Sequence, residues 1–349
     1  MPFFSRGNDD DKAAQAAAET EQAASLEALE RGELPLRAQQ RLAEIGKASS
    51  GFFTSDLSVN EFALGHSLGL RPIAQVMGSS IYHVGWQQRP GFYGGWQVGG
   101  VSQELTVVSE AWNTARRRAF ARLEQEATLV GADAVVGVHL TKGAHDWAAG
   151  AIEYIAVGTA VRVDGAERGG RPVLTDLSGQ DTWKLWQSGY RPLGVVGAST
   201  VHYVVSGWST QRMSGYWSSW ANQELRDFTR GVYDARETAI GRMTEEARTH
   251  GAAGVVGVAI EHSVEEREIE SGGSRRTDLV VTFHVLGTSI GERRPDGRDL
   301  RDPAGRTAAA TANGEAEPAA TPAPASPSGS PTQGRRRPRE ARSERGSLF

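Results

Sequence analysis

The clearest pattern in the chain is an apolar stripe with helical spacing that occurs twice. Apolar side chains recur every three or four residues over 105–130 and again over 225–247, which gathers them on one side of an α-helix. Each region is therefore predicted to form one long amphipathic helix, ended by Gly131 or Gly251 as a left-handed cap. The stripe positions are Leu105, Val108, Trp112, Ala115, Ala119, Leu123, Ala127 and Val130, and then Leu225, Phe228, Val232, Ala235, Ala239, Met243 and Ala247.

Runs rich in β-branched residues surround each helix and predict strands. Ser58-x-x-Glu61 and Ser178-x-x-Asp181 precede them and are typical of the N-terminal box of a short helix. One helix cannot cover both faces of a sheet, so each copy is expected to leave a face or an edge open for a neighbour. The predicted strands are 73–84, 135–140 and 151–163, and then 193–205, 255–260 and 277–290.

The two halves of the pattern are copies of one sequence. At an offset of 120 residues, 55–140 aligns with 175–260 without a gap, and 25 of the 86 pairs are identical. The densest block aligns 131–138 with 251–258. The sequence therefore predicts an α+β protein with two tandem small domains, 55–165 and 175–292, each a β-sheet packed by one long amphipathic helix.

The regions outside the repeat are polar. Residues 1–50 are predicted to be a polar helical N-terminal arm, loosely attached because its apolar stripe is thin. Eight of the fourteen prolines lie beyond 292, among Ala, Ser, Thr and Gly, so 293–349 is predicted to be a disordered tail. The tail could bind nucleic acid or an acidic partner, or its charge could simply maintain solubility. Its basic cluster is Arg335, Arg336, Arg337 and Arg339.

Composition narrows the class of protein. The 349 residues carry a formal net charge of −4, which gives no global attraction to nucleic acid or anionic lipid. The absence of cysteine excludes disulfides, thiolate metal sites and Cys nucleophiles. The N-terminus has no apolar core typical of a signal peptide, and no stretch approaches the length of a membrane span. We therefore expect a cytoplasmic protein without a membrane span.

Catalytic and metal-binding patterns are weak. No spacing of the eight histidines matches a recognisable ligand pair, and the nearest cluster is His139, His145 and Asp146. No P-loop, nucleophile elbow or dinucleotide motif occurs. Asp133 lies in the densest repeat block, yet its counterpart is Ala253, so the two copies cannot share chemistry through it. We expect no catalytic site, no cofactor and no enzyme, with metal binding as an alternative.

Aromatic residues gather in the loop before each long helix. Large rings supply much apolar contact area at little conformational cost, so they are frequent at interfaces. We expect these loops to form an oligomer or domain interface; core packing and a ligand or nucleic-acid platform are the alternatives. The residues are Trp86, Phe92, Tyr93, Trp96, Trp208, Tyr216, Trp217 and Trp220.

One block resembles a known family. The helix, the GADAVVGV segment that follows it and a strand that ends V-x-G-T-A-V are similar to the YbjQ-like family, which is described as "putative heavy-metal-binding". The resemblance covers about 65–163 and 187–290. It implies a small α+β domain that assembles into closed rings, pentameric in known members, and a metal name without a defined ligand set. The matching positions are Glu104, Leu105, Ala115, Arg116, Ala119, Leu123, Ala127, 131–138 and 157–161.

These observations favour a non-enzymatic, oligomeric binding or scaffold protein of this family, with its ligand unknown. A homo-oligomer, ring-like in form, is the expected assembly. The two domains of a chain would either enter two stacked rings or alternate within a single ring. The alternatives are a heavy-metal-binding protein, or association with nucleic acid or an acidic partner through the Arg-rich tail.

Overall fold

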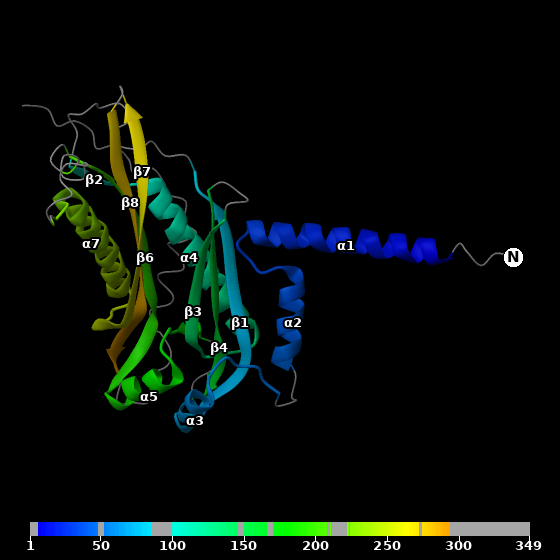
Figure 1. Ribbon diagram of the computed structural model, residues 1–349. Coiled ribbons are helices and arrows are strands. Elements are labelled where there is room, and N and C mark those ends of the chain that lie inside the picture. Colours follow the sequence, from blue (N-terminus) through cyan, green and yellow to red (C-terminus); the bar gives the residue numbers. More distant parts are fainter. Residues whose placement is uncertain are drawn as a thin grey trace, which may run out of the picture. The chain divides into compact units, whose positions relative to one another are not determined.

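The computed structural model describes residues 6–47, 52–85, 100–145, 150–165, 170–207, 224–271 and 274–293, with the single residues 210 and 222. These residues lie within the first of two compact units, Met1–Arg306; the second unit is Thr307–Phe349. In the described part of the chain, six helices and eight strands form two four-stranded sheets (Figure 1). The α+β prediction with two tandem copies is confirmed.

The first sheet has the order β1-β4-β3-β5. Strands β1 (Leu70–His83) and β3 (Ala134–His145) both pair antiparallel with β4 (Ala151–Val163), and the short β5 (Val173–Leu174) runs parallel to β3. Helix α4 (Thr106–Leu129) packs along β1 and β4. Its predicted stripe lies in the core, where Ala115, Leu123 and Val130 are fully buried.

The second sheet has the order β2-β6-β8-β7 and repeats this plan. Strands β6 (Tyr190–Val205), β8 (Ser274–Glu292) and β7 (Gly254–Ser271) correspond to β1, β4 and β3, and α7 (Arg226–Thr249) packs on β6 and β8. The fourth strand, β2 (Val101–Glu104), comes from the first copy.

The strands β3 and β7 are longer than the sequence indicates. They were predicted to end at 140 and 260, but they run to His145 and Ser271. The extension of β7 is a hairpin with β8 that pairs as far as Ser271 and Ser274. Apart from Val264 and Ile269 its side chains are polar, and most are exposed, so no apolar run marks it. Cross-strand pairing, which a local pattern does not reveal, sets the length of these strands.

The predicted helix boundaries are confirmed. Ser58 accepts from the backbone N–H of Glu61, and Glu61 accepts from that of Ser58, so α3 (Val59–Ser67) begins with a full capping box. In α5 (Gly179–Gln187), Ser178 accepts from the N–H of Asp181. Gly131 and Gly251 follow the long helices with φ of 71° and 66°, the left-handed region that glycine tolerates.

The N-terminal arm forms α1 (Arg6–Glu30) and α2 (Leu36–Lys47). The expectation of loose attachment was wrong for α2, because Leu42 is fully buried in the core cluster that also contains residues of α4. Among the described helices, none is both long and apolar enough to cross a membrane. The tail 293–349 lies almost wholly outside the described residues, so its disorder stays a prediction.

The junction between the two copies as a candidate functional site

Helix α4 lies between the two sheets and contacts both (Figure 1). It packs on β1 and β4 of its own copy and also on β6 of the second copy. Leu105 and Trp112 pack there against Val201 and Tyr203, which are both buried. The second sheet therefore has a helix on each face, α7 on one and α4 on the other.

The two copies also exchange strands. The segment 173–177 leads into the second copy, yet it extends the edge of β3 in the first copy. The Thr175 N–H donates to the carbonyl of Val135 at 2.9 Å, and the Gly137 N–H donates to the carbonyl of Leu177 at 3.0 Å. In return, β2 of the first copy pairs antiparallel with β6 of the second. Each copy thus completes the sheet of the other, which makes the junction specific in register.

Asn113 joins α4 to the backbone of β6. Its side-chain amide donates to the Ser199 carbonyl at 2.8 Å, and its oxygen accepts from the Ser199 N–H at 2.9 Å. A similar bond runs from the Val201 N–H to the hydroxyl of Ser109 at 2.9 Å. These side chains are buried, so each bond satisfies a backbone group that water does not reach.

A polar cluster lies at the centre of the junction. The Tyr154 hydroxyl, the Ser199 hydroxyl and Nδ1 of His284 are separated by 2.9, 2.8 and 3.1 Å. The Trp112 ring meets the His284 ring edge to face, with 4.9 Å between centroids. Burial, together with the smaller effect of the nearby Lys142 charge, lowers the pKa of His284 to about 3. Burial also raises the pKa of Tyr154 to about 12, against the smaller opposite effect of its bond to Ser199.

This cluster is suited to holding the copies together and unsuited to acid–base chemistry. Both His284 and Tyr154 are neutral at pH 7 with these pKa values, whereas a general acid or base is most effective with a pKa near the working pH. Tyr154 and Ser199 are also buried, which leaves no room for a substrate against their hydroxyls. We therefore describe the cluster as a buried hydrogen-bond network between domains.

An ion pair continues the junction along α4. Arg116 donates from Nη2 to Oε2 of Glu246 on α7 at 3.1 Å, and the same oxygen accepts from the Gly197 N–H at 2.9 Å. A Cβ at Gly197 would lie 2.4 Å from the carbonyl oxygen of Val285, so the close approach of β6 to β8 at this point requires glycine. Arg116 is buried by the contact with the second copy.

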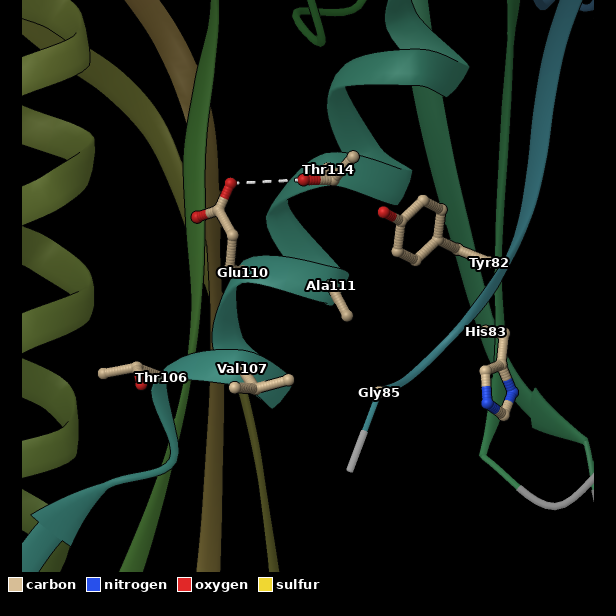
Figure 2. A pocket seen from close by; sticks show the side chains of 8 residues that line it. All are labelled: Tyr82, His83, Gly85, Thr106, Val107, Glu110, Ala111 and Thr114. Carbon is tan, nitrogen blue, oxygen red and sulfur yellow. Dashed lines mark hydrogen bonds between the residues drawn. The ribbon is translucent and has the colours of Figure 1, made fainter. Parts of the chain in front are cut away.

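A surface pocket of about 610 Å³ lies between the end of β1 and the first turns of α4. Figure 2 shows the Tyr82 ring pointing from β1 toward α4, with Glu110 and Thr114 on the helix. The Glu110 carboxylate accepts from Thr114 at 3.2 Å and also from Arg117, so structural contacts engage it. The pocket is lined by Tyr82, His83, Gly85, Thr106, Val107, Glu110, Ala111 and Thr114.

The sites predicted from sequence are only partly described. All eight aromatic residues of the two loops lie outside the described residues, and so do Asp146 and the Arg cluster of the tail. His139 is exposed on β3, and the side chain of His145 is outside the described set. Within the described part of the chain, no group of three or more His, Cys, Asp or Glu side chains is arranged to hold a metal ion.

Sequence reasoning missed the polar junction. A usable signal was the difference between the copies: Asn113 is replaced by Tyr233 in the second copy, and His284 takes the place of Ile155. A polar group present in one copy alone is expected where the two copies have different neighbours. Nothing in the local pattern indicates which neighbour that is.

Comparison with known proteins agrees with this architecture. The model of the YbjQ-like family, described as "Putative heavy-metal-binding", matches residues 96–164 and 188–288. The chain is similar to a Mycobacterium tuberculosis protein named an encapsulin nanocompartment protein, with 44% identity over 228 residues, or 63% of this chain and 80% of the relative. No solved structure matches the chain significantly.

Proposed function

The chain belongs to the YbjQ-like family, and on that premise we propose that it is a non-enzymatic scaffold or binding protein that works as a homo-oligomer. The single observation that carries the proposal is an uncovered apolar sheet face. On β1, Met77 and Ile81 are 48% and 56% exposed. Their counterparts on β6, Gly197 and Val201, are buried under α4. The first sheet therefore has the same open face that the second sheet buries, and a partner is expected to cover it.

The chemistry of the described residues supports a role without catalysis. The most strongly perturbed titratable groups, His284 and Tyr154, lie in the buried junction, where they hold two domains together. Perturbed groups in an open cleft would have favoured an enzyme. The pocket between β1 and α4 offers a carboxylate that is already paired.

The name of the mycobacterial relative supports an assembly as the working form. That protein is named an encapsulin nanocompartment protein. By analogy with this name, we propose that the oligomer of this chain is a component of a protein nanocompartment. Gradient sedimentation of lysate from its own cells tests this extension: the chain should sediment with particles much larger than its purified oligomer. Sedimentation at the purified size alone would contradict it.

Native mass spectrometry of untagged protein tests the oligomer itself. The expected result is a mass of several whole chains at micromolar concentration. The spectrum should show a defined number of subunits and no broad distribution of sizes. The same spectrum reports any bound ligand or metal. A clean single-chain mass under these conditions would refute the proposed function.

A further inference from the structure

We propose that the second copy of one chain docks on the first copy of another chain in the arrangement that joins the two copies within a chain. In this contact, residues 53–57 of one chain extend the sheet at β7 of its neighbour, and α7 of that neighbour covers the outer face of β1. The inference rests on the proposed function and specifies its partner, a second copy of this chain, and the surfaces that meet. Three features of the chain support it.

The first feature is the extended segment 53–57, which precedes the first copy and joins no sheet among the described residues. We call it, and its counterpart 173–177, the leader segment of its copy. Residues 53–57 correspond to 173–177 and are anchored in the same way: the Asp56 N–H donates to Thr159 at 3.3 Å, and the Asp176 N–H donates to Thr288 at 3.1 Å. The two leaders differ in their surroundings. Segment 173–177 lies on β3, whereas 53–57 pairs with no strand among the described residues. Phe53 is accordingly 40% exposed, and its counterpart Val173 is 3% exposed.

The second feature is the outer edge of β7, on which no leader segment lies among the described residues. Strand β7 is the last strand of the second sheet, and its outer edge pairs with no other described strand. Gly137 and Gly257 have φ of 64° and 66°, so the same bulge interrupts β3 and β7. In β3 the bulge directs the N–H groups of Gly137 and Val138 to the leader. In β7 the equivalent Val258 is 40% exposed. An open edge of this kind is a template for another strand.

The third feature is a pair of uncovered faces. Tyr233 on α7 is 59% exposed, whereas Asn113, at the same position of α4, is 5% exposed because it contacts β6. The face of β1 that carries Met77 and Ile81 is uncovered as well. Placing α7 of one chain on β1 of the next buries both surfaces, as α4 and β6 bury theirs.

The charges on the two proposed contact surfaces, α7 of one chain and the β1 face of the next, are complementary. In the internal junction Arg116 pairs with Glu246. The equivalent pair between chains is Arg236, half exposed on α7, and Glu126, which accepts from the Met77 N–H at 2.8 Å. Burial raises the pKa of Glu126 above its usual value. The hydrogen bond from the Met77 N–H and the charge of Arg41, 3.9 Å away, lower this pKa by a smaller amount. A second cation close to Glu126 would stabilise its charged form.

These features select a second copy over any unrelated occupant, since each open surface has its complement on the same chain. The contact joins unlike surfaces, so it is heterologous and proceeds head to tail. Such contacts close into a ring when the rotation between successive domains permits, and otherwise continue as a filament. Within this arrangement the two domains of a chain are neighbours in one series, rather than members of two stacked rings.

Engineered disulfides test the contact directly, because the wild-type chain contains no cysteine. The β5–β3 register places Val173 opposite Ala134, and the equivalent pair between chains is Phe53 and Gly254. A Cβ at Gly254 would meet no atom within 4 Å, so cysteine fits there. The test protein carries Phe53→Cys and Gly254→Cys, and the matched control carries Val173→Cys and Ala134→Cys.

After mild oxidation with copper–phenanthroline, the test protein should give covalent multimers on a non-reducing denaturing gel. The control should close within the chain and remain a monomer without free thiols. A second measurement is independent of disulfide geometry: Ile81→Glu should reduce the native mass to that of one chain. Leu26→Glu should leave the mass unchanged, because Leu26 has the same 56% exposure but lies on α1.

The outcomes separate the inference from the proposed function. A wild-type protein of single-chain mass refutes both. An oligomeric wild type overturns only this inference if Ile81→Glu keeps the full mass, or if the test protein stays uncrosslinked while the control closes. Covalent multimers together with dissociation by Ile81→Glu support the contact.

Discussion

Mild acid is expected to weaken the junction between the two copies through His284. Burial lowers the pKa of this imidazole to about 3 in the folded protein, whereas an exposed histidine titrates near 6.5. The folded state therefore holds a neutral ring against the hydroxyls of Tyr154 and Ser199, and the unfolded chain takes up a proton below pH 6.5. The stability that depends on neutral His284 is fully present above pH 6.5. It is lost progressively as the pH falls toward about 3.

The size of the effect follows from linkage. Each pH unit between the two pKa values changes the free energy of unfolding by at most about 1.4 kcal/mol, so lowering the pH from 7 to 5 costs on the order of 2 kcal/mol. The variant His284→Gln stays neutral and retains a side-chain acceptor and donor. Its stability should therefore fall less than that of the wild type over the same range, by about this amount.

Urea denaturation at pH 7, 6 and 5, followed by tryptophan fluorescence, measures the difference. The matched control is His262→Gln, because His262 is exposed on β7 and its ring stacks on Phe283. The control should follow the pH dependence of the wild type. Equal losses of stability in wild type and His284→Gln between pH 7 and 5 would refute the assignment of a strongly lowered pKa to this residue.

Four further predictions follow from the described contacts and the composition. Asn113→Leu should lower the free energy of unfolding by on the order of 2 kcal/mol, because two buried backbone groups of β6 lose their partners; an unchanged urea midpoint would contradict this. Gly78→Ala should destabilise the protein, since its Cβ would lie 2.0 Å from a carbonyl oxygen of α4, whereas Gly241→Ala on open helix surface should stabilise it by up to about 1 kcal/mol; thermal melts compare them. Protein purified without a His tag should carry no stoichiometric zinc, copper or nickel by elemental analysis, and a stoichiometric metal that His139→Ala removes would overturn this. Deleting residues 335–349 should abolish any steeply salt-dependent binding of nucleic acid in fluorescence anisotropy, and binding that survives the deletion would exclude the Arg cluster.

Much of each domain could be predicted because its signals are local. The stripe over 105–130 specifies a helix and its buried side, and Ser58 and Gly131 mark helix boundaries through side-chain capping and positive φ. The repeat extended these predictions to the second copy without further information. The open sheet face expected from one helix per sheet is also present, at β1.

The junction could not be predicted because its contacts join distant residues. Nothing near Thr175 indicates that its strand extends β3 of the preceding copy, since an extended segment can pair with any open edge of compatible register. Nor does the sequence around His284 show that its neighbours are Tyr154 and Trp112. The second half of β7 was also missed, because its sequence is polar and it forms a strand only through pairing with β8.

The covalent link between the two copies affects how the assembly forms and how it dissociates on dilution. In a closed head-to-tail ring, half of the domain contacts are intramolecular, and their effective concentration does not change with the amount of protein. Dilution can therefore release whole two-domain chains but not single domains. A ring that closes through these contacts also contains an even number of domains, so this chain cannot form a ring of five domains.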